Sequence, residues 1–175
     1  MRYVCLLRGI NVGGNTMIKM SELSAMFESL GFKGVKTYIN SGNVAFDAAK
    51  TSEEKLVARI EKAIEGMFGK KIPVMLREQK DIDRILANNP FDGEFESHKE
   101  MHVLFLNEEM SADKEKQLLE ASPEGERYKC IGRELYCHLP KGVIESLLGK
   151  SFIEKKLKLA VTGRNWRTVQ KLAEL

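Results

Sequence analysis

The sequence lacks any apolar run long enough to cross a membrane. Its 175 residues are 43% hydrophobic and 30% charged, and no stretch approaches the roughly 18 consecutive apolar residues that a transmembrane helix needs. The first residues have a strand-like pattern where a secretory signal peptide would carry its apolar segment and cleavage site. We therefore expect no membrane partner and a cytoplasmic location.

Cysteine is scarce as well. Cys5, Cys130 and Cys137 are an odd number of cysteines with no CxxC pair. Each lies in a strand-like run, where a thiol usually packs as a small buried hydrophobic group. We expect reduced, structural thiols rather than a disulfide framework.

The histidines do not form a metal-binding pattern either. His98 and His102 flank Glu100, and His138 follows Cys137, but no second ligand pair has the spacing of a zinc site. Surface histidines, or histidines hydrogen-bonded within the fold, are the commoner explanation. The sequence predicts no metal ion and no cofactor.

Glycine, by contrast, is concentrated in one loop. Arg8 to Asn15 directly follows the apolar run Tyr3 to Leu7 and contains three glycines within six residues. Such turns permit positive φ angles, and their consecutive N–H groups can form an anion-holding concavity. The candidate binding residues of this loop are Arg8, Gly9, Asn11, Gly13 and Gly14. The alternative is that the glycines only shape a connection between a strand and a helix.

This loop is not a nucleotide-hydrolysing P-loop. Residues 9–16 read GINVGGNT, which fits the spacing GxxxxGK[ST] except that Asn15 replaces the lysine that reaches the β- and γ-phosphates. The following helix is expected to start near Ser21, well after the last glycine. A nucleoside triphosphatase is therefore disfavoured.

Residues 1–78 predict the element order β-α-β-β-α-β. Strands are expected at 3–7, 35–40, 43–47 and 72–77, and helices after Ser21 and after a Thr51/Glu54 capping box. This is the order of the ferredoxin-like fold, the split βαβ or α-β plait. In that fold the first and third strands are antiparallel neighbours, so the glycine loop should meet the turn before the third strand. That turn adds Asn40, Ser41, Gly42 and Asn43 to the candidate ligand site.

The third strand also bears on nucleic-acid binding. Alternation places Val44 and Phe46 on the helix-covered face and leaves Asn43, Ala45 and Asp47 outward. An RNA-recognition module would need aromatic side chains on the outward face to stack bases. A nucleic-acid partner is therefore not expected.

The second half predicts a similar plan without a clear final strand. Strands are expected at 101–106, 127–131 and 135–139, and helices at 111–120, at 143–148 and from a Ser151/Glu154 capping box to about residue 157. Residues 79–99 are expected to form a short helix and a polar linker. The predicted fold class is therefore α+β, with one ferredoxin-like unit at 1–78 and a second at 100–175 that ends in a basic helix.

The C-terminal segment is unusually basic. From Lys150 to Lys171, seven basic residues stand against one acidic residue, Glu154. This is compatible with an anionic partner, although a solvated basic helix face is the commoner explanation. Trp166 is expected to dock the last helix, and Arg164 and Asn165, at its exposed start, are further candidates for reaching a ligand.

Three separated motifs carry a family resemblance. They read LLRGINVGG from Leu6, YINSGNV from Tyr38 and RNWRTV from Arg164. Together they resemble the bacterial domain of unknown function 1697 family over nearly the whole chain. The resemblance implies a cytoplasmic bacterial protein with tandem ferredoxin-like domains and no established activity.

Three functional interpretations follow from these patterns. The first is a module that binds a small anionic ligand, such as a nucleotide or phosphorylated metabolite, at the glycine loop. The second is an enzyme acting in the same cleft, with Arg8 and Asn11 as orienting groups. Near the motif only Lys19 and Glu22 could move a proton, so binding is favoured over catalysis. The third is a protein-interaction scaffold that pairs through a sheet edge or the Trp166 helix.

Overall fold

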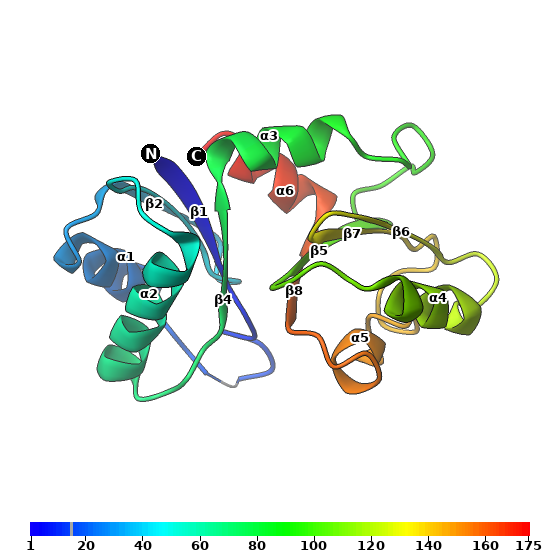
Figure 1. The fold of residues 1–175 in the computed structure, drawn as a ribbon, viewed down its shortest axis with the longest axis horizontal. Helices are drawn as coiled ribbons and strands as arrows, with labels where there is room; N and C mark the ends of the chain where they lie inside the picture. The colour runs from blue at the N-terminus through cyan, green and yellow to red at the C-terminus, as the bar shows by residue number, and fades with distance from the viewer. Residues whose placement is uncertain (15) are drawn as a thin grey trace. The chain divides into compact units, whose positions relative to one another are not determined.

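The computed structural model describes residues 1–14 and 16–175 and shows a mixed α/β chain (Figure 1). Within these residues, eight strands form two four-stranded antiparallel sheets and six helices accompany them. The chain divides into two compact units, Met1–Asp83 with Lys171–Leu175, and Arg84–Gln170. No helix among the described residues has the length and apolar character needed to cross a bilayer.

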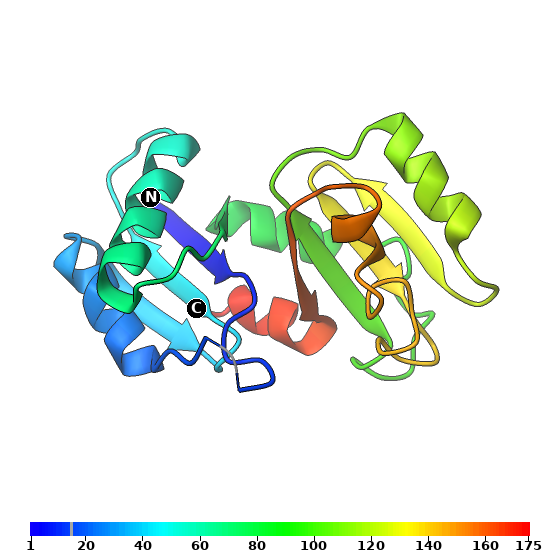
Figure 2. The same cartoon turned by 90° about the horizontal axis from the view of Figure 1, so that it is seen from below.

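The first unit has the predicted order β-α-β-β-α-β. Its elements are β1 (Arg2–Leu7), α1 (Met20–Ser29), β2 (Lys33–Tyr38), β3 (Asn43–Asp47), α2 (Glu53–Phe68) and β4 (Val74–Glu78), and α3 (Gln79–Ala87) follows. The sheet order is β2-β3-β1-β4. β1 pairs antiparallel with β3, with Leu6 opposite Asn43, so the predicted neighbourhood of these strands is confirmed. Figures 1 and 2 show α1 and α2 on the same face of this sheet.

The core of this unit lies between the sheet and the two helices. Phe46 packs face to face on Phe32, with ring centroids 4.4 Å apart, and Leu56 and Ile60 of α2 belong to the same buried cluster. Val44 and Phe46 lie on the helix-covered face as predicted, with Asn43 and Ala45 on the other face, but that face is not open to solvent at these residues, because both are fully buried. In β1, Val4 and Leu6 alternate with residues of the buried cluster, so their side chains point to the opposite face of the sheet. They are fully buried too, so both faces of the sheet are shielded from water at this strand.

The helix starts in this unit differ slightly from the predictions. Lys19, rather than Ser21, precedes α1 and supplies no side-chain cap. At α2 the cap is Ser52, whose Oγ accepts a hydrogen bond from the Lys55 N–H, so the predicted Thr51/Glu54 box is displaced by one residue. A hydroxyl one position later satisfies the same unpaired N–H groups.

The second unit repeats the plan of the first. Its elements are β5 (Met101–Leu106), α4 (Ala112–Ala121), β6 (Arg127–Ile131), β7 (Glu134–His138), α5 (Phe152–Lys155) and β8 (Val161–Asn165), followed by α6 (Trp166–Leu172). The sheet order is β6-β7-β5-β8, which matches the first unit strand for strand. Leu118 of α4 and Ile153 of α5 share a buried cluster with Leu104 and Leu135, so both helices cover one face of the sheet (Figure 1).

Two expectations for the second unit were wrong. A final strand is present, because β8 pairs with β5 along its whole length, with Leu106 opposite Val161. Residues 143–148 form turns rather than a helix. There the chain folds back tightly enough that a Cβ on Gly149 would lie 2.2 Å from the Ile144 main-chain oxygen, and α5 starts only after Ser151, which has a positive φ and no side-chain cap.

Candidate functional site

The glycine loop and the β2–β3 turn meet at one edge of the first sheet. The Leu7 N–H donates to the Gly42 main-chain oxygen at 2.9 Å. The Asn11 side-chain amide nitrogen donates to the Asn40 main-chain oxygen at 2.7 Å. Two segments that are distant in sequence therefore lie in direct contact, as the strand order predicted.

The base of the glycine loop is fixed by a buried anchor on each side. Ile10 and Ile18 are buried in the core cluster. Between them, the Asn11 side chain donates to the Ile18 main-chain oxygen at 3.0 Å and accepts from the Ile18 N–H at 2.7 Å. The tip, with Gly13 and Gly14, is exposed. Asn15 lies outside the described residues.

Gly42 is required where the two segments approach. Its φ is +88°, and a Cβ there would lie 2.7 Å from Ile10 Cδ1 and 2.8 Å from Leu7 Cβ. A larger residue would force the turn away from the glycine loop. Gly42 is therefore a structural member of the predicted site.

Two of the predicted asparagines are also used within the fold. Both amide hydrogens of Asn11 are engaged, as described above. Asn43 is fully buried, and its amide nitrogen donates to the Tyr38 main-chain oxygen at 2.8 Å and to Ser41 Oγ at 3.0 Å. These side chains hold the loops in place, whereas Asn40 is exposed and contributes its main-chain oxygen to the contact.

Arg8 lies where β1 ends and is half-buried. Its N–H donates to the main-chain oxygen of Pro73, directly before β4, at 3.0 Å. The α2–β4 connection therefore reaches the same edge of the sheet, and it carries Lys70 and Lys71, which are exposed and form no ion pair with any described residue. These lysines were not among the predicted site residues, although the pairing of the first and fourth strands in the predicted fold was a signal for them.

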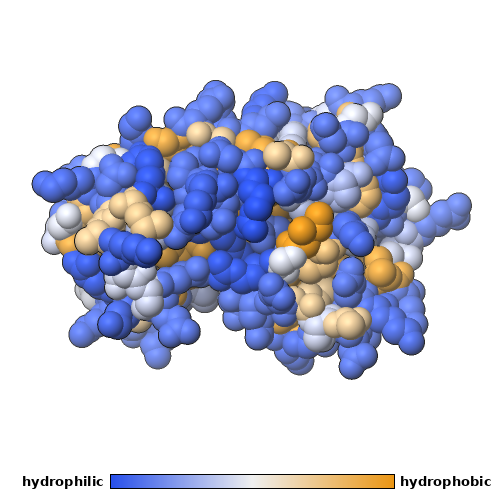
Figure 3. Space-filling view, turned by 45° about the horizontal axis from the view of Figure 1, so that its top comes forward, coloured by the Kyte–Doolittle hydropathy of each residue, from blue (hydrophilic) through white to orange (hydrophobic). Residues whose placement is uncertain are grey.

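The two loops also concentrate unusual backbone angles and exposed apolar side chains. Asn11, Thr16 and Ile39 have φ angles of 54°, 51° and 48°. Such angles are rare for a β-branched residue, and strained residues often mark functional sites. Val12, Met17 and Ile39 are 64%, 70% and 48% exposed, whereas the face of the molecule in Figure 3 is mostly hydrophilic with scattered apolar residues.

Arg164 does not have the predicted position at an exposed helix start, whereas Asn165 directly precedes the helix and is half-buried. Arg164 lies in β8 and is buried, and its Nη1 donates to Thr162 Oγ1 at 2.7 Å and to the Gly163 oxygen at 2.8 Å. The backbone pairs with β5 up to Asn165, so α6 begins only at Trp166. Asn165 Oδ1 caps this helix by accepting from the Thr168 N–H. Both residues belong to the second unit.

The histidines are placed as structural residues. Arg127 Nη2 lies 3.1 Å from Nδ1 of the buried His138, and because a guanidinium can only donate, Nδ1 accepts. Glu100 Oε1 lies 3.8 Å from the other ring nitrogen. Within the described part of the chain, no group of three or more His, Cys, Asp or Glu side chains could hold a metal ion.

The thiols are poor candidates for nucleophilic catalysis. None of the three cysteines is in a disulfide, and Cys5 and Cys137 are buried. Burial raises the pKa of Cys137 well above its ordinary value and also raises the pKa of Cys130. Both thiols therefore stay protonated near neutral pH, and a protonated thiol is a weak nucleophile.

Comparisons with known proteins place the chain in a family. A family model described as protein of unknown function (DUF1697) matches residues 1–136. No curated protein matches the chain. A solved structure, that of the conserved bacterial protein SP0830 from Streptococcus pneumoniae, is similar with a TM-score of 0.79 and 25% sequence identity, over 99% of this chain and 97% of that chain. The chain therefore belongs to the DUF1697 family.

Proposed function

We propose that this protein binds a small anionic molecule, such as a nucleotide or phosphorylated metabolite, where the glycine loop meets the β2–β3 turn. The observation that carries the proposal is a loop with a fixed base and an exposed tip. Asn11 and two buried isoleucines hold the base, and Gly13 and Gly14, both with positive φ, form the tip. Main-chain N–H groups in such turns can hold an anion without a change of backbone conformation on binding.

The charges near this edge support an anion over a cation. Residues 8–19 contain Arg8 and Lys19 and no acidic residue. Lys70 and Lys71 lie in the α2–β4 connection, whose last residue, Pro73, accepts a hydrogen bond from the Arg8 N–H. A guanidinium that meets a phosphate can form two parallel charge-assisted hydrogen bonds. The proposed contacts are therefore the Arg8 side chain and the N–H groups of Gly9, Gly13 and Gly14, with Asn40 and Ser41 beside them.

The proposal favours binding over catalysis. In the loop and its approach to α1, the groups that could transfer a proton are Lys19 and Glu22, and both are exposed. A general acid or base is normally tuned by burial or by a neighbouring charge. Arg164 is left out of the proposed site because its guanidinium is buried and bonded within its own strand.

A second candidate function is protein interaction at the same edge. It is favoured by the exposure of Val12 and Ile39, which belong to the two loops, and of Met17, which follows the glycine loop. Exposed apolar side chains that gather in one place often mark an interface. A partner protein would cover these side chains, whereas a small anion would leave them exposed.

We also propose that each unit is a ferredoxin-like fold and that the protein is cytoplasmic. The fold proposal is supported by the shared order of four strands in the two sheets and by two helices on one face of each. The location is supported by the three cysteines, none of which is in a disulfide, since a reducing compartment keeps thiols reduced.

Native mass spectrometry of protein purified from a bacterial cytoplasm tests the binding proposal. We expect a small molecule to remain on the wild-type chain and to be absent from the Arg8→Ala variant. A second copy or another protein on the wild-type chain, with no small molecule, would favour the interface instead. A small molecule retained equally by both variants would contradict the role of Arg8.

A further inference from the structure

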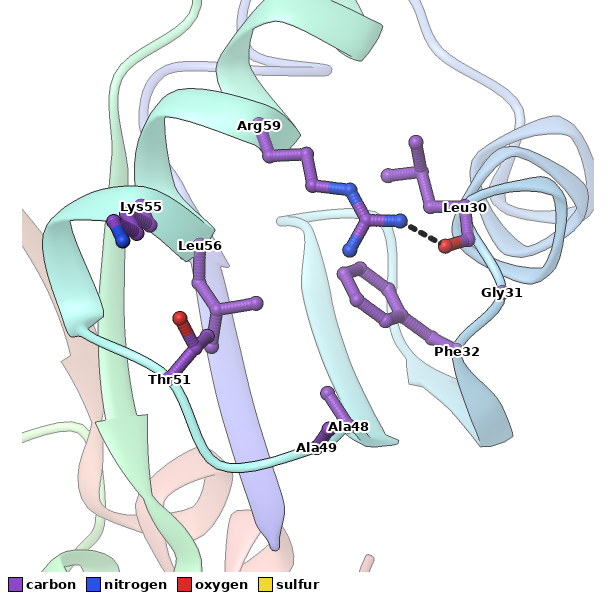
Figure 4. A pocket seen from close by; sticks show the side chains of 9 residues that line it. All are labelled: Leu30, Gly31, Phe32, Ala48, Ala49, Thr51, Lys55, Leu56 and Arg59. Atoms are coloured by element: carbon purple, nitrogen blue, oxygen red, sulfur yellow. Dashed lines mark hydrogen bonds between the residues drawn. The ribbon is translucent and has the colours of Figure 1, made fainter.

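A cavity of about 410 Å³ lies at the opposite end of the first sheet from the glycine loop. It is lined by Leu30, Gly31, Phe32, Ala48, Ala49, Thr51, Lys55, Leu56 and Arg59 (Figure 4). β1 and β3 are antiparallel, with Arg2 opposite Asp47. Ala48 directly follows Asp47 at this end of the strands, whereas the glycine loop follows the other end of β1. The two sites are therefore separated by the length of the strands.

A fixed guanidinium forms one wall of the cavity. Arg59 Cζ lies 5.0 Å from the centroid of the Phe32 ring, and Nη2 donates to the main-chain oxygen of Leu30 at the end of α1. The Phe32 ring is itself held by its stacking on Phe46. Arg59 is therefore oriented before any ligand arrives, which reduces the entropy lost on binding.

The positive charge in this cavity has no acidic partner among the described residues. Arg59 uses one of its five N–H groups in the bond to Leu30, and the others make no hydrogen bond there. The Lys55 ammonium has neither an ion pair nor a hydrogen bond there. Lys55 and Arg59 are one helical turn apart, a spacing at which like charges destabilise a helix. None of the lining residues is acidic, so an anion would remove this repulsion.

The remaining walls are apolar. Leu56 and Phe32 are buried at the base, with Leu30 and Ala48 beside them. Figure 4 shows the Arg59 side chain extending from α2 toward Phe32 and Leu30, with Thr51 and Leu56 on the facing side. A cavity of this volume, with apolar walls and a few polar groups, has the size and character of a small-molecule site.

We propose that this cavity is a second ligand site, which takes a small organic anion with a carboxylate or phosphate group and a short apolar body. The anionic group binds to the Arg59 guanidinium and is attracted by Lys55, which lines the same cavity, and the apolar body packs against Leu30, Leu56 and Ala48. This site does not depend on the glycine loop.

The test is an amide NMR titration of the full chain with benzoate and with phenyl phosphate, against sodium chloride at matched ionic strength. We expect saturable shifts at the amides of Gly31, Ala49 and Thr51. Saturation by benzoate alone assigns a carboxylate ligand, and saturation by phenyl phosphate alone assigns a phosphate. If neither probe causes saturable shifts at these amides, the proposal is overturned.

Two matched variants separate specific binding from general attraction to a basic helix. Lys55→Gln should weaken the binding by about fivefold. Lys62→Gln removes an exposed lysine of the same helix that does not line the cavity, and it should leave the binding unchanged. Equal losses in the two variants would overturn the proposal. Arg8→Ala should not alter these shifts, so failure at one site is distinguishable from failure at the other.

Discussion

The side-chain amide nitrogen of Asn11 donates a hydrogen bond to the main-chain oxygen of Asn40 at 2.7 Å. This bond joins the glycine loop to the β2–β3 turn across 29 residues of sequence. The same amide group also closes the loop on itself through Ile18. One side chain therefore fixes both the shape of the loop and its position against the turn.

Replacement of Asn11 should be costly for stability. Asn11→Ala removes three hydrogen bonds and puts alanine at a φ of 54°, so we expect the free energy of unfolding to fall by about 2–4 kcal/mol. Asn11→Gly should cost less, because glycine adopts this φ without strain. Asn40→Ala is the control, since only the main-chain oxygen of Asn40 takes part, and it should change stability by less than about 0.5 kcal/mol. Equal losses in Asn11→Ala and Asn40→Ala, measured by urea denaturation, would contradict this account.

Ile39 offers a test of backbone strain at the site. It is β-branched, has a φ of 48° and is 48% exposed. Asparagine tolerates this conformation far better, so Ile39→Asn should raise the free energy of unfolding by about 1 kcal/mol. Val12→Asn is the matched control at an exposed apolar residue whose φ is not positive, and it should bring no gain. A loss of stability in Ile39→Asn would show that the Ile39 side chain packs favourably where it lies.

His102 should make stability depend on pH. Burial, and secondarily the nearby His98, lowers the pKa of His102 below its ordinary value of 6.5. Below pH 6.5 the unfolded chain then binds more protons than the folded chain, so the free energy of unfolding should fall as the pH drops from 6.5 toward the lowered pKa and stay level above 6.5. Chemical denaturation at pH 7 and pH 5 should show a smaller decrease for His102→Gln than for the wild type. The same decrease in both would mean that His102 does not contribute.

The segment that follows α3, which lies within the second unit, is expected to be the first site of proteolysis. Residues 92–100 contain no helix or strand, and Asp92, Gly93 and Glu94 are exposed. A glutamate-specific protease has targets there and also in α2, at Glu54 and Glu65. Mass analysis of the first fragments should show cleavage at Glu94 or Glu96. Initial cleavage within α2 would contradict the predicted division of the chain.

Local patterns were sufficient to predict most of the strands and the contact between the two loops. β3 has the predicted bounds, and the contact of the glycine loop with the β2–β3 turn, seen at Asn11 and Asn40, followed from the order of the first four strands alone. β8 escaped prediction because its sequence, VTGRN, lacks the alternation of a half-buried strand, and its pairing with β5 is a long-range contact. Sequence periodicity does not report such contacts.

The composition of the candidate site was harder to predict than its location. Asn11, Asn43 and Gly42 are polar or small loop residues in the sequence, and their types suit a ligand site as well as a structural joint. Their contacts with Ile18, Tyr38 and Ile10 show that these three residues are used within the fold. Such contacts depend on tertiary packing, which the sequence does not show. Lys70 and Lys71 were missed for a different reason: the predicted pairing of the first strand with the fourth places their connection at the same edge, but only the turn before the third strand was considered.

An amide NMR titration of wild type and Arg8→Ala with pyrophosphate tests whether the glycine loop binds an anion with the help of Arg8. We expect saturable shifts at the amides of Gly9, Gly13 and Gly14, and binding that is about tenfold weaker in Arg8→Ala, whose melting temperature stays within a few degrees of the wild type. Two results would contradict it. One is no saturable shift at these glycines, and the other is a large loss of stability in Arg8→Ala, which would make Arg8 a structural residue.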